Sequence, residues 1–182
     1  KQWQTKFGDA APTFVNMYGP TECTVISTYR ILPRELTEPE AEANNIGKPM
    51  ADTRIFVMDQ QGQLLPYGFP GELCIAGGGV VDGYLNRPEL TQEKFFEAPH
   101  LKLDSKLYRS GDLVCLDPNG HLHYIKRIDR QVKIRGFRIE LDEISSHLRT
   151  LSYIKFAEAI SFTDRFGYER LAAFIIPEND GL

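Results

Sequence analysis

The sequence predicts a chain of mixed class, α/β and α+β, on three observations. Residues 13–29 alternate apolar runs with a turn, which is typical of the edge of a larger sheet. Short apolar segments separated by Gly, Pro and Asn turns recur over residues 46–127, a pattern typical of a small barrel or sandwich. After residue 129 the spacing of apolar residues becomes helical between two strands, which predicts a small α+β unit.

The first part of the chain is predicted to hold a short helix at residues 3–7, a buried strand at 13–16 and a β-rich run at 23–29. The pair Gly19-Pro20 forces a turn directly after the first strand. Residues 35–45 are rich in glutamate and are expected to form a solvated loop or a frayed helix.

The middle of the chain is predicted to be mostly strands that each run into a turn. A helix is expected at residues 88–95, because Pro88 suits the first turn of a helix. The glycines at 77–79 predict a backbone bend and no phosphate-binding loop, since no Lys-Ser/Thr pair follows them. The predicted strands cover residues 54–59, 72–76, 113–116 and 121–126.

The last part of the chain is predicted to begin with a strand at residues 131–134 and a turn at Arg135-Gly136. Leucine and isoleucine recur at helical spacing over residues 141–151. Two further strands are expected on either side of a turn, at residues 157–162 and 171–176. The change of pattern by itself gives only weak support for a domain boundary near Asp129-Arg130.

The composition disfavours several classes of partner and site. The 182 residues are 42% hydrophobic and 25% charged, with a formal net charge of −4 at pH 7, which does not favour nucleic acid or an anionic membrane as a partner. The sequence has no apolar run of about 18 residues and no signal-peptide pattern. Three widely spaced cysteines favour neither a disulfide framework nor a zinc site, so a reducing cytoplasm is expected.

The segment NMYGPTE at residues 16–22 combines an aromatic ring, a hydroxyl and a carboxylate around one tight turn. These groups are predicted to lie at the end of a strand, where ligands of open α/β sheets bind. An aromatic face and a carboxylate are suited to holding ATP and Mg²⁺. Taken alone, the same residues also fit ordinary turn chemistry.

Three more segments follow in order: GELCIAGGGV at 71–80 with GYL at 83–85, YRSGDL at 108–113, and RIDRQVKIRGFRIEL at 127–141. Together with NMYGPTE they resemble the adenylate-forming enzymes. Within these, the sequence is most similar to the amino-acid adenylation domains of nonribosomal peptide synthetases. Four ordered motifs are far more specific than any one of them, and the resemblance covers nearly all of the chain.

The resemblance implies the end of a large α/β domain at residues 1–129, including a small β-barrel subdomain at about 46–127. A small α+β C-terminal subdomain, truncated, would follow at 130–182. Two elements of the family are missing from the sequence: a Ser/Thr/Gly-rich loop over the ATP phosphates and a late catalytic lysine. The chain is therefore expected to be part of an adenylation domain and to be inactive alone.

The resemblance also assigns roles in the NMYGPTE segment. Thr21 would give a hydroxyl to the α-phosphate, and Glu22 would bind Mg²⁺. The ring of Tyr18 would lie against adenine, the Asn16 amide would read its exocyclic amine, and Gly19 would belong to the same cofactor site. Each assignment suits the donors, acceptors and faces of its side chain.

Further nucleotide contacts are implied on the later motifs. Asp112 would accept hydrogen bonds from both ribose hydroxyls, although an Asp at a Gly turn before a strand is the plainer interpretation of the motif alone. Tyr124 and Arg127 would contact the ribose and the phosphates, and an arginine fork suits phosphate oxygens. Thr21, Glu22 and Arg127 would then form the catalytic set.

The resemblance also implies which residues contact the amino-acid substrate and the carrier protein. Met17, Val25 and Ile26 would line the pocket for the amino-acid side chain, and their apolar character favours a hydrophobic substrate. Asp129 would be the hinge between the two subdomains. Gly136 would lie beside the channel through which the carrier's phosphopantetheine arm enters.

The expected function is activation of an amino acid by ATP to an aminoacyl-AMP, which is then passed to the phosphopantetheine thiol of a peptidyl carrier protein. Neighbouring synthetase domains are further expected partners. Two alternatives stay open: a D-alanine, aryl-acid or other carboxylic-acid ligase of the same superfamily, and a non-catalytic fragment that docks carrier proteins. A barrel that binds oligosaccharide or nucleic acid is disfavoured by the acidic charge.

Overall fold

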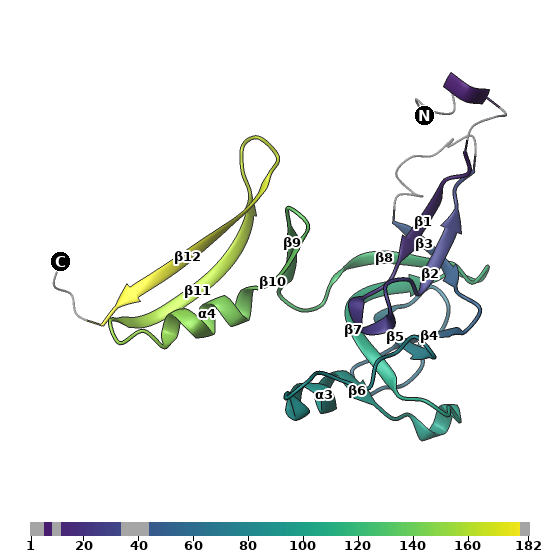
Figure 1. The fold of residues 1–182 in the computed structure, drawn as a ribbon, viewed down its shortest axis with the longest axis horizontal. Coiled ribbons are helices and arrows are strands. Elements are labelled where there is room, and N and C mark those ends of the chain that lie inside the picture. The colour runs from purple at the N-terminus through teal and green to yellow at the C-terminus, as the bar shows by residue number, and fades with distance from the viewer. Residues whose placement is uncertain (1–5, 9–11, 34–43, 179–182) are drawn as a thin grey trace. The chain divides into compact units, whose positions relative to one another are not determined.

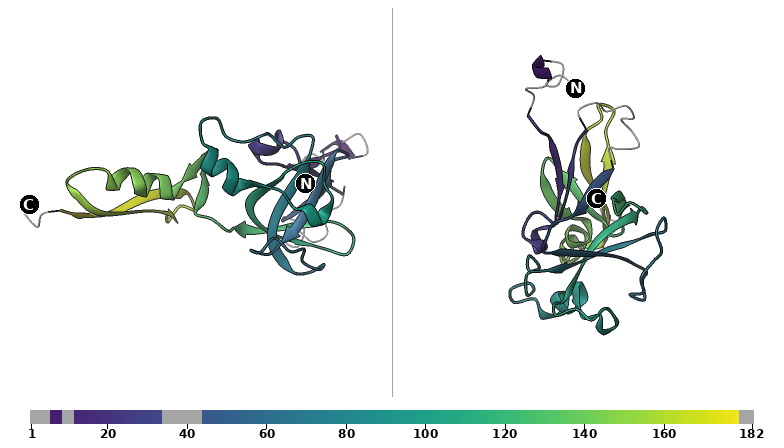
Figure 2. Two further views of the ribbon diagram at one scale, coloured as in Figure 1. Left: turned by 90° about the horizontal axis from the view of Figure 1, so that it is seen from below. Right: turned by 90° about the vertical axis from the view of Figure 1, so that its right-hand side faces the viewer.

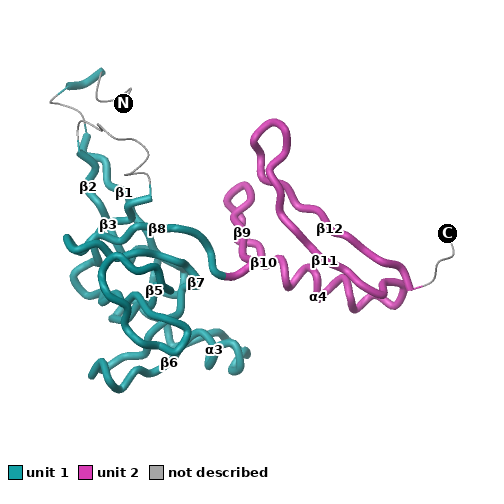
Figure 3. The backbone as a smooth tube through the Cα atoms, turned by 180° about the vertical axis from the view of Figure 1, so that it is seen from behind, with its two compact units in different colours: residues 1–128 teal, residues 129–182 magenta. Residues whose placement is uncertain are grey.

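The computed structural model describes residues 6–8, 12–33 and 44–178. Its backbone divides into two compact units, residues 1–128 and 129–182 (Figures 1 and 3). Both are rich in strands and poor in helices. Among the described residues, no helix is long and apolar enough to cross a membrane.

The first unit is built on one antiparallel sheet. Its strands follow the order β1-β2-β3-β8-β7-β5-β4, with β6 paired to β7. In the part of the chain that the structure describes, β4 does not pair with β1 or β3, so the strands of the predicted barrel form an open sheet with two edge strands, β1 and β4. The strands are β1 Val15–Tyr18, β2 Thr28–Ile31, β3 Asn45–Pro49, β4 Thr53–Met58, β5 Pro70–Gly77, β6 Phe95–Phe96, β7 Leu107–Leu116 and β8 Leu122–Arg127.

Two predictions for the N-terminal part are wrong. The strand predicted at residues 13–16 is β1, and it lies at Val15–Tyr18. It is not buried: Val15 and Met17 are 42% and 57% exposed, because β1 is the end strand of the sheet. The predicted β-rich run begins instead with a 3₁₀ turn at Thr21–Cys23, and only its end belongs to β2. Most of the predicted helix at 3–7 and of the predicted loop at 35–45 lies outside the described residues.

The strand β7 differs most from its prediction. It begins at Leu107, six residues before the predicted start at residue 113, and passes through the Gly111-Asp112 pair. The expected turn there is a bulge, in which Gly111 has φ 72° and the β5 ladder shifts register. The strand continues because a bulge absorbs extra residues without ending the pairing. The helix α3, Pro88–Lys94, ends one residue earlier than predicted.

The core of the first unit lies on both faces of β5. Leu73 and Ile75 belong to one buried cluster, while Cys74 and Ala76 belong to the other. Successive strand residues point to opposite faces, so the apolar run in β5 indicates burial on both sides. Burial raises the pKa of the Cys74 thiol to about 12, which keeps this thiol neutral.

The second unit places a helix on a two-stranded ribbon. The helix α4, Leu141–Arg149, packs against β11, Ile154–Thr163, which pairs with β12, Glu169–Pro177 (Figure 2). Ahead of them, β9, Gln131–Ile134, has the bounds predicted from the sequence and pairs with β10, Phe137–Glu140.

Side chains cover the edge of β11 that does not face β12. Arg149 Nε donates to the Ala157 carbonyl at 2.8 Å, and Arg130 Nη2 donates to the Ala159 carbonyl at 2.7 Å. The Ala159 amide donates to Ser145 Oγ at 2.9 Å. Backbone groups that a neighbouring strand could pair with are thereby occupied.

We expect Gly77→Ala to destabilise the first unit far more than Gly78→Ala. Gly77 has φ 130°, and a Cβ there would lie 2.0 Å from the Asp52 carbonyl oxygen, whereas a Cβ on Gly78 meets nothing within 4 Å. Gly77→Ala should lower the free energy of unfolding by at least about 2 kcal/mol, and Gly78→Ala by less than about 0.5 kcal/mol. Urea unfolding of both variants measures the difference, and equal midpoints would contradict the close approach.

Candidate active site

The loop after β1 turns back across its own start. A Cβ on Gly19 would lie 2.4 Å from the Val25 carbonyl oxygen and 2.7 Å from the Ser27 nitrogen, so only glycine fits under the returning chain. The Ser27 amide donates to the Tyr18 carbonyl at 2.8 Å. The NMYGPTE segment is therefore held in a closed loop with Tyr18 at its base.

The tip of this loop has an unusual backbone. Thr24 and Val25 have φ values of 55° and 73°, a region that β-branched residues rarely adopt. Contacts from the segment after β5 hold it: Thr24 Oγ1 donates to the Gly79 carbonyl at 2.7 Å, and the Val81 amide donates to the Glu22 carbonyl at 3.0 Å. A strained backbone persists only where its surroundings fix it in this way, and such strain is concentrated at functional sites.

Three predicted site residues meet at one buried carboxylate. Asp112 is 5% exposed, and its Oδ2 accepts a hydrogen bond from the Tyr18 hydroxyl. Arg127 lies opposite Asp112 on β8, and its Nη1 donates to Asp112 Oδ1 at 3.1 Å and to the Ser110 carbonyl at 2.8 Å. The Asp112 amide donates to Ser110 Oγ at 3.0 Å. Tyr18, Asp112 and Arg127 therefore act as one hydrogen-bonded group.

The electrostatics of this group favour a neutral Tyr18 phenol. Burial raises the pKa of Tyr18 far above its usual value, and the negative charge of Asp112 raises it further. The Tyr18 hydroxyl therefore keeps its proton and remains a donor.

Glu22 is held by a residue for which the sequence predicted no role. Its side chain is 6% exposed, and its Oε1 accepts a hydrogen bond of 2.7 Å from the Tyr84 hydroxyl. The Tyr84 ring meets Phe95 edge to face with centroids 5.5 Å apart, which fixes the tyrosine. Burial and the hydrogen bond to Glu22 raise the pKa of Tyr84, so this phenol is also a donor.

Glu22 fits the way proteins hold magnesium beside a nucleotide. No group of three or more His, Cys, Asp and Glu side chains within the described ranges could enclose a metal ion. Mg²⁺ at phosphate sites typically needs only one or two carboxylates together with phosphate oxygens. One fixed carboxylate at the loop meets that requirement.

Asn16 and Tyr124 lie on strands that flank the Asp112 group. Asn16 Nδ2 donates to the Asn45 carbonyl at 3.0 Å, which leaves Oδ1 as the acceptor of this amide. Tyr124 packs against the core cluster that contains Leu73 and Ile75, and its amide donates to the Asn44 carbonyl at 2.8 Å.

The other predicted site residues are not gathered around Asp112. Met17 and Val25 are 57% and 70% exposed, and Ile26 is partly buried beside them in the loop. Thr21 is exposed at the start of the 3₁₀ turn. In the second unit, Gly136 has φ 84° in the predicted two-residue turn between β9 and β10, as type I′ hairpins require.

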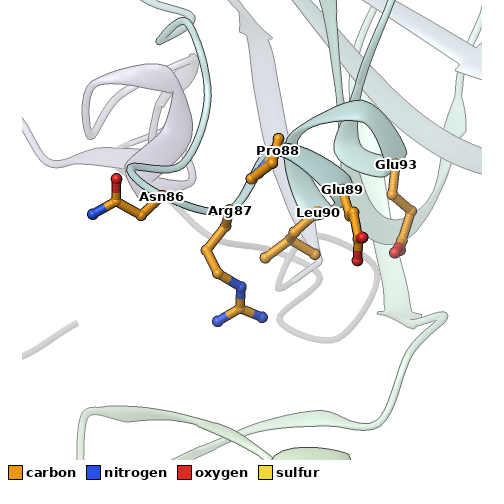
Figure 4. Close-up of a pocket in the computed structure, with 6 residues that line it drawn as sticks. All are labelled: Asn86, Arg87, Pro88, Glu89, Leu90 and Glu93. Atoms are coloured by element: carbon orange, nitrogen blue, oxygen red, sulfur yellow. The ribbon is translucent and has the colours of Figure 1, made fainter.

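A shallow hollow elsewhere in the first unit contains none of these residues. It lies at the start of α3, and its side chains point into open space (Figure 4). Arginine and glutamate side chains of opposite charge share its wall, so it has no single charge preference. Its lining residues are Asn86, Arg87, Pro88, Glu89, Leu90 and Glu93.

Comparison with known proteins shows the family to which the chain belongs. A family described as AMP-binding enzyme matches residues 1–85. Bacitracin synthase 1 of Bacillus licheniformis is 53% identical over 134 residues, which is 74% of this chain. The chain belongs to the adenylate-forming, AMP-binding family. Within it, the relatives are nonribosomal peptide synthetases, and the chain spans 2% of the length of bacitracin synthase 1.

Solved structures of adenylate-forming proteins share the fold. The Vibrio cholerae adenylation domain AlmE, in complex with glycyl-adenosine-5′-phosphate, has a TM-score of 0.74 and 32% identity, covering 98% of this chain and 34% of AlmE. PA1221, a nonribosomal peptide synthetase protein with adenylation and PCP domains, has a TM-score of 0.74 and 27% identity, covering 97% and 35%. This chain therefore corresponds to about a third of each.

Sequence reasoning missed two residues that organise this site. Tyr84 was visible in the GYL segment, but nothing near it in the sequence indicates Glu22, 62 residues away, as its partner. Ser110 is 2% exposed and accepts the Asp112 amide. Its place in the YRSGDL motif, two residues before Asp112, was the only available signal.

We expect Tyr84→Phe to destabilise the protein by about 1–3 kcal/mol, because Glu22 would lose a buried hydrogen-bond donor. Tyr67→Phe is the matched control, since Tyr67 is 61% exposed and its hydroxyl should contribute little. Urea unfolding at neutral pH compares the two. Equal stabilities would show that the Tyr84 hydroxyl does not support Glu22.

Proposed function

We propose that the protein containing this chain uses ATP to convert an amino acid into an aminoacyl-AMP. The observation that carries the proposal is the buried Asp112 carboxylate, held between the Tyr18 hydroxyl and Arg127. A fixed carboxylate next to an aromatic ring and a guanidinium suits a nucleoside phosphate, which combines vicinal hydroxyls, a flat base and anionic oxygens.

In this proposal the nucleoside binds along β1, β7 and β8. Asp112 accepts hydrogen bonds from the ribose hydroxyls, and the face of Tyr18 lies against adenine. Asn16 reads the exocyclic amine through Oδ1, because its Nδ2 already donates to Asn45. Tyr124 contacts the ribose from β8, and Gly19 lets the loop pass close to the nucleotide.

The phosphates bind at the loop. Thr21 donates its hydroxyl to the α-phosphate, and Arg127 supplies positive charge from β8. Glu22 holds Mg²⁺, which offsets the negative charge of the phosphates when bound. The reaction is attack by the amino-acid carboxylate on the α-phosphorus with release of pyrophosphate, so the site acts by positioning two anions and by reducing their repulsion.

Two relatives of known structure support the proposal for the substrate and the carrier. AlmE was solved with an aminoacyl adenylate, glycyl-adenosine-5′-phosphate, and PA1221 combines adenylation and PCP domains. We infer an amino-acid substrate, with Met17, Val25 and Ile26 favouring an apolar side chain. A peptidyl carrier protein then receives the acyl group on its phosphopantetheine thiol, beside Gly136, and neighbouring synthetase domains complete the assembly.

We expect Asp112→Ala in the full-length protein to lower kcat/KM for ATP by at least about 10-fold to 150-fold, the range that corresponds to one hydrogen bond to a charged group, because the hydrogen bonds from both ribose hydroxyls are lost. The measurement is amino-acid-dependent pyrophosphate exchange, with a melting curve to check folding. Asp104→Ala, at an exposed position before β7, is the control and should leave ATP kinetics unchanged. Unchanged kinetics in Asp112→Ala would remove Asp112 from the ribose site.

We also expect Asp129→Pro to keep adenylate formation while slowing transfer to the carrier thiol at least about tenfold, as proposed for a hinge that needs backbone freedom. Asp129 begins the second unit. Its Oδ1 also accepts the Gln131 amide at 3.1 Å, so a purely structural role predicts equal losses in both half-reactions. Pyrophosphate exchange and carrier loading, measured on one preparation, distinguish the two roles.

A further inference from the structure

The bulge in β7 contains Asp112, whose Oδ2 accepts the hydrogen bond from the Tyr18 hydroxyl. Glu72 on β5 pairs with Leu113 on β7, and the next pair is Cys74 with Arg109. A step of two residues along β5 thus corresponds to a step of four residues along β7. The strand β7 therefore carries extra residues in the segment that holds Gly111 and Asp112. Such a bulge removes backbone groups from the ladder and leaves them in need of other partners.

Side chains supply those partners. The Asp112 amide donates to Ser110 Oγ at 3.0 Å, and the Gly111 amide donates to Glu72 Oε1 at 3.1 Å. The Gly111 carbonyl accepts the Ile128 amide at 2.8 Å, which ties the bulge to the end of β8. The bulge is thus fixed from both neighbouring strands, and Glu72 is the side chain that holds it from β5.

Glu72 is itself held in place. Its Oε2 accepts a hydrogen bond of 2.8 Å from Arg109 Nη1, and the two side chains are 17% and 23% exposed. The Arg109 guanidinium lies over the Phe96 ring, 4.4 Å from its centroid. The two oxygens of Glu72 therefore have separate tasks: one pairs with Arg109, and the other receives the Gly111 amide.

We infer that Glu72 is a positioning residue for the nucleotide ribose, acting through the Gly111 bulge on Asp112. The inference rests on the proposed function, in which Asp112 accepts the ribose hydroxyls. Glu72 touches no ligand in this arrangement. Its carboxylate fixes the peptide that precedes Asp112, and the bulge geometry then sets the direction of the Asp112 side chain.

Two substitutions, Glu72→Ala and Glu72→Gln, distinguish the hydrogen bond from the Gly111 amide from the ion pair with Arg109. Alanine removes both contacts of the carboxylate. Glutamine loses the charge beside Arg109 but keeps an oxygen that can accept the Gly111 amide. If the contact to Gly111 matters, glutamine rescues the variant, and if only the ion pair matters, both substitutions behave alike.

The test is the ratio of the dissociation constants of 2′-deoxyAMP and AMP, measured by calorimetry on the full-length protein. We expect a wild-type ratio of about ten or more, because the deoxynucleotide leaves one acceptor of Asp112 unused. Asp112→Ala should bring the ratio near one. Glu72→Ala should lower the ratio at least about threefold, and Glu72→Gln should restore it to within about twofold of wild type.

The control is Glu93→Ala, which removes an exposed carboxylate that pairs with Lys94 at 3.2 Å on α3 and should keep the wild-type ratio. If Glu72→Ala does not fold, Glu72→Asp replaces it: the charge stays, but the shorter side chain reaches only one of its two partners, and the ratio should again fall.

Two results would overturn the inference while leaving the ribose site intact. One is a wild-type ratio in folded Glu72→Ala, or in Glu72→Asp where that variant replaces it, and the other is equal losses in Glu72→Gln and Glu72→Ala; in both cases Asp112→Ala would still have a ratio near one. A ratio that does not change in Asp112→Ala, or a wild-type ratio near one, would overturn the ribose site and the inference with it.

Discussion

A carboxylate that is almost completely removed from water has to be surrounded by donors, because an unpaired buried charge is strongly destabilising. Asp112 is in this position, and its donors come from β1 and β8 while its own strand is β7. Strands that are far apart in the sequence are thereby tied at one point. Two of the side chains that we propose to contact a nucleotide, Tyr18 and Arg127, are also the donors to this carboxylate.

The loop after β1 is subject to a second constraint, which is steric. Gly19 has no room for a side chain beneath the returning chain, and Thr24 and Val25 take left-handed backbone conformations at its tip. These features oppose folding of the loop by itself. The segment that follows β5 compensates through its contacts to Thr24 and Glu22, so the loop geometry depends on residues more than fifty positions away.

The local sequence pattern predicted many of the strands but few of the side-chain contacts that join them. The strand at Gln131–Ile134 and the turn at Arg135-Gly136 were predictable because alternation and turn chemistry are local. The start of β7 was not, since Gly111 and Asp112 look like a turn when the neighbouring strands that hold a bulge are unknown. Likewise, the motifs identified Tyr18, Asp112 and Arg127 individually. The roles of Tyr84 and Glu72 depend on partners 62 and 39 residues away, which no periodicity encodes.

The covered edge of β11 has a consequence for modularity. Arg130, Ser145 and Arg149, which occupy its backbone groups, all belong to the second unit. The backbone groups of β11 that these side chains occupy therefore find their partners within the second unit. Recombination that joined residues 129–182 to a different large domain would carry these contacts along, so this part of the β11 edge would stay covered.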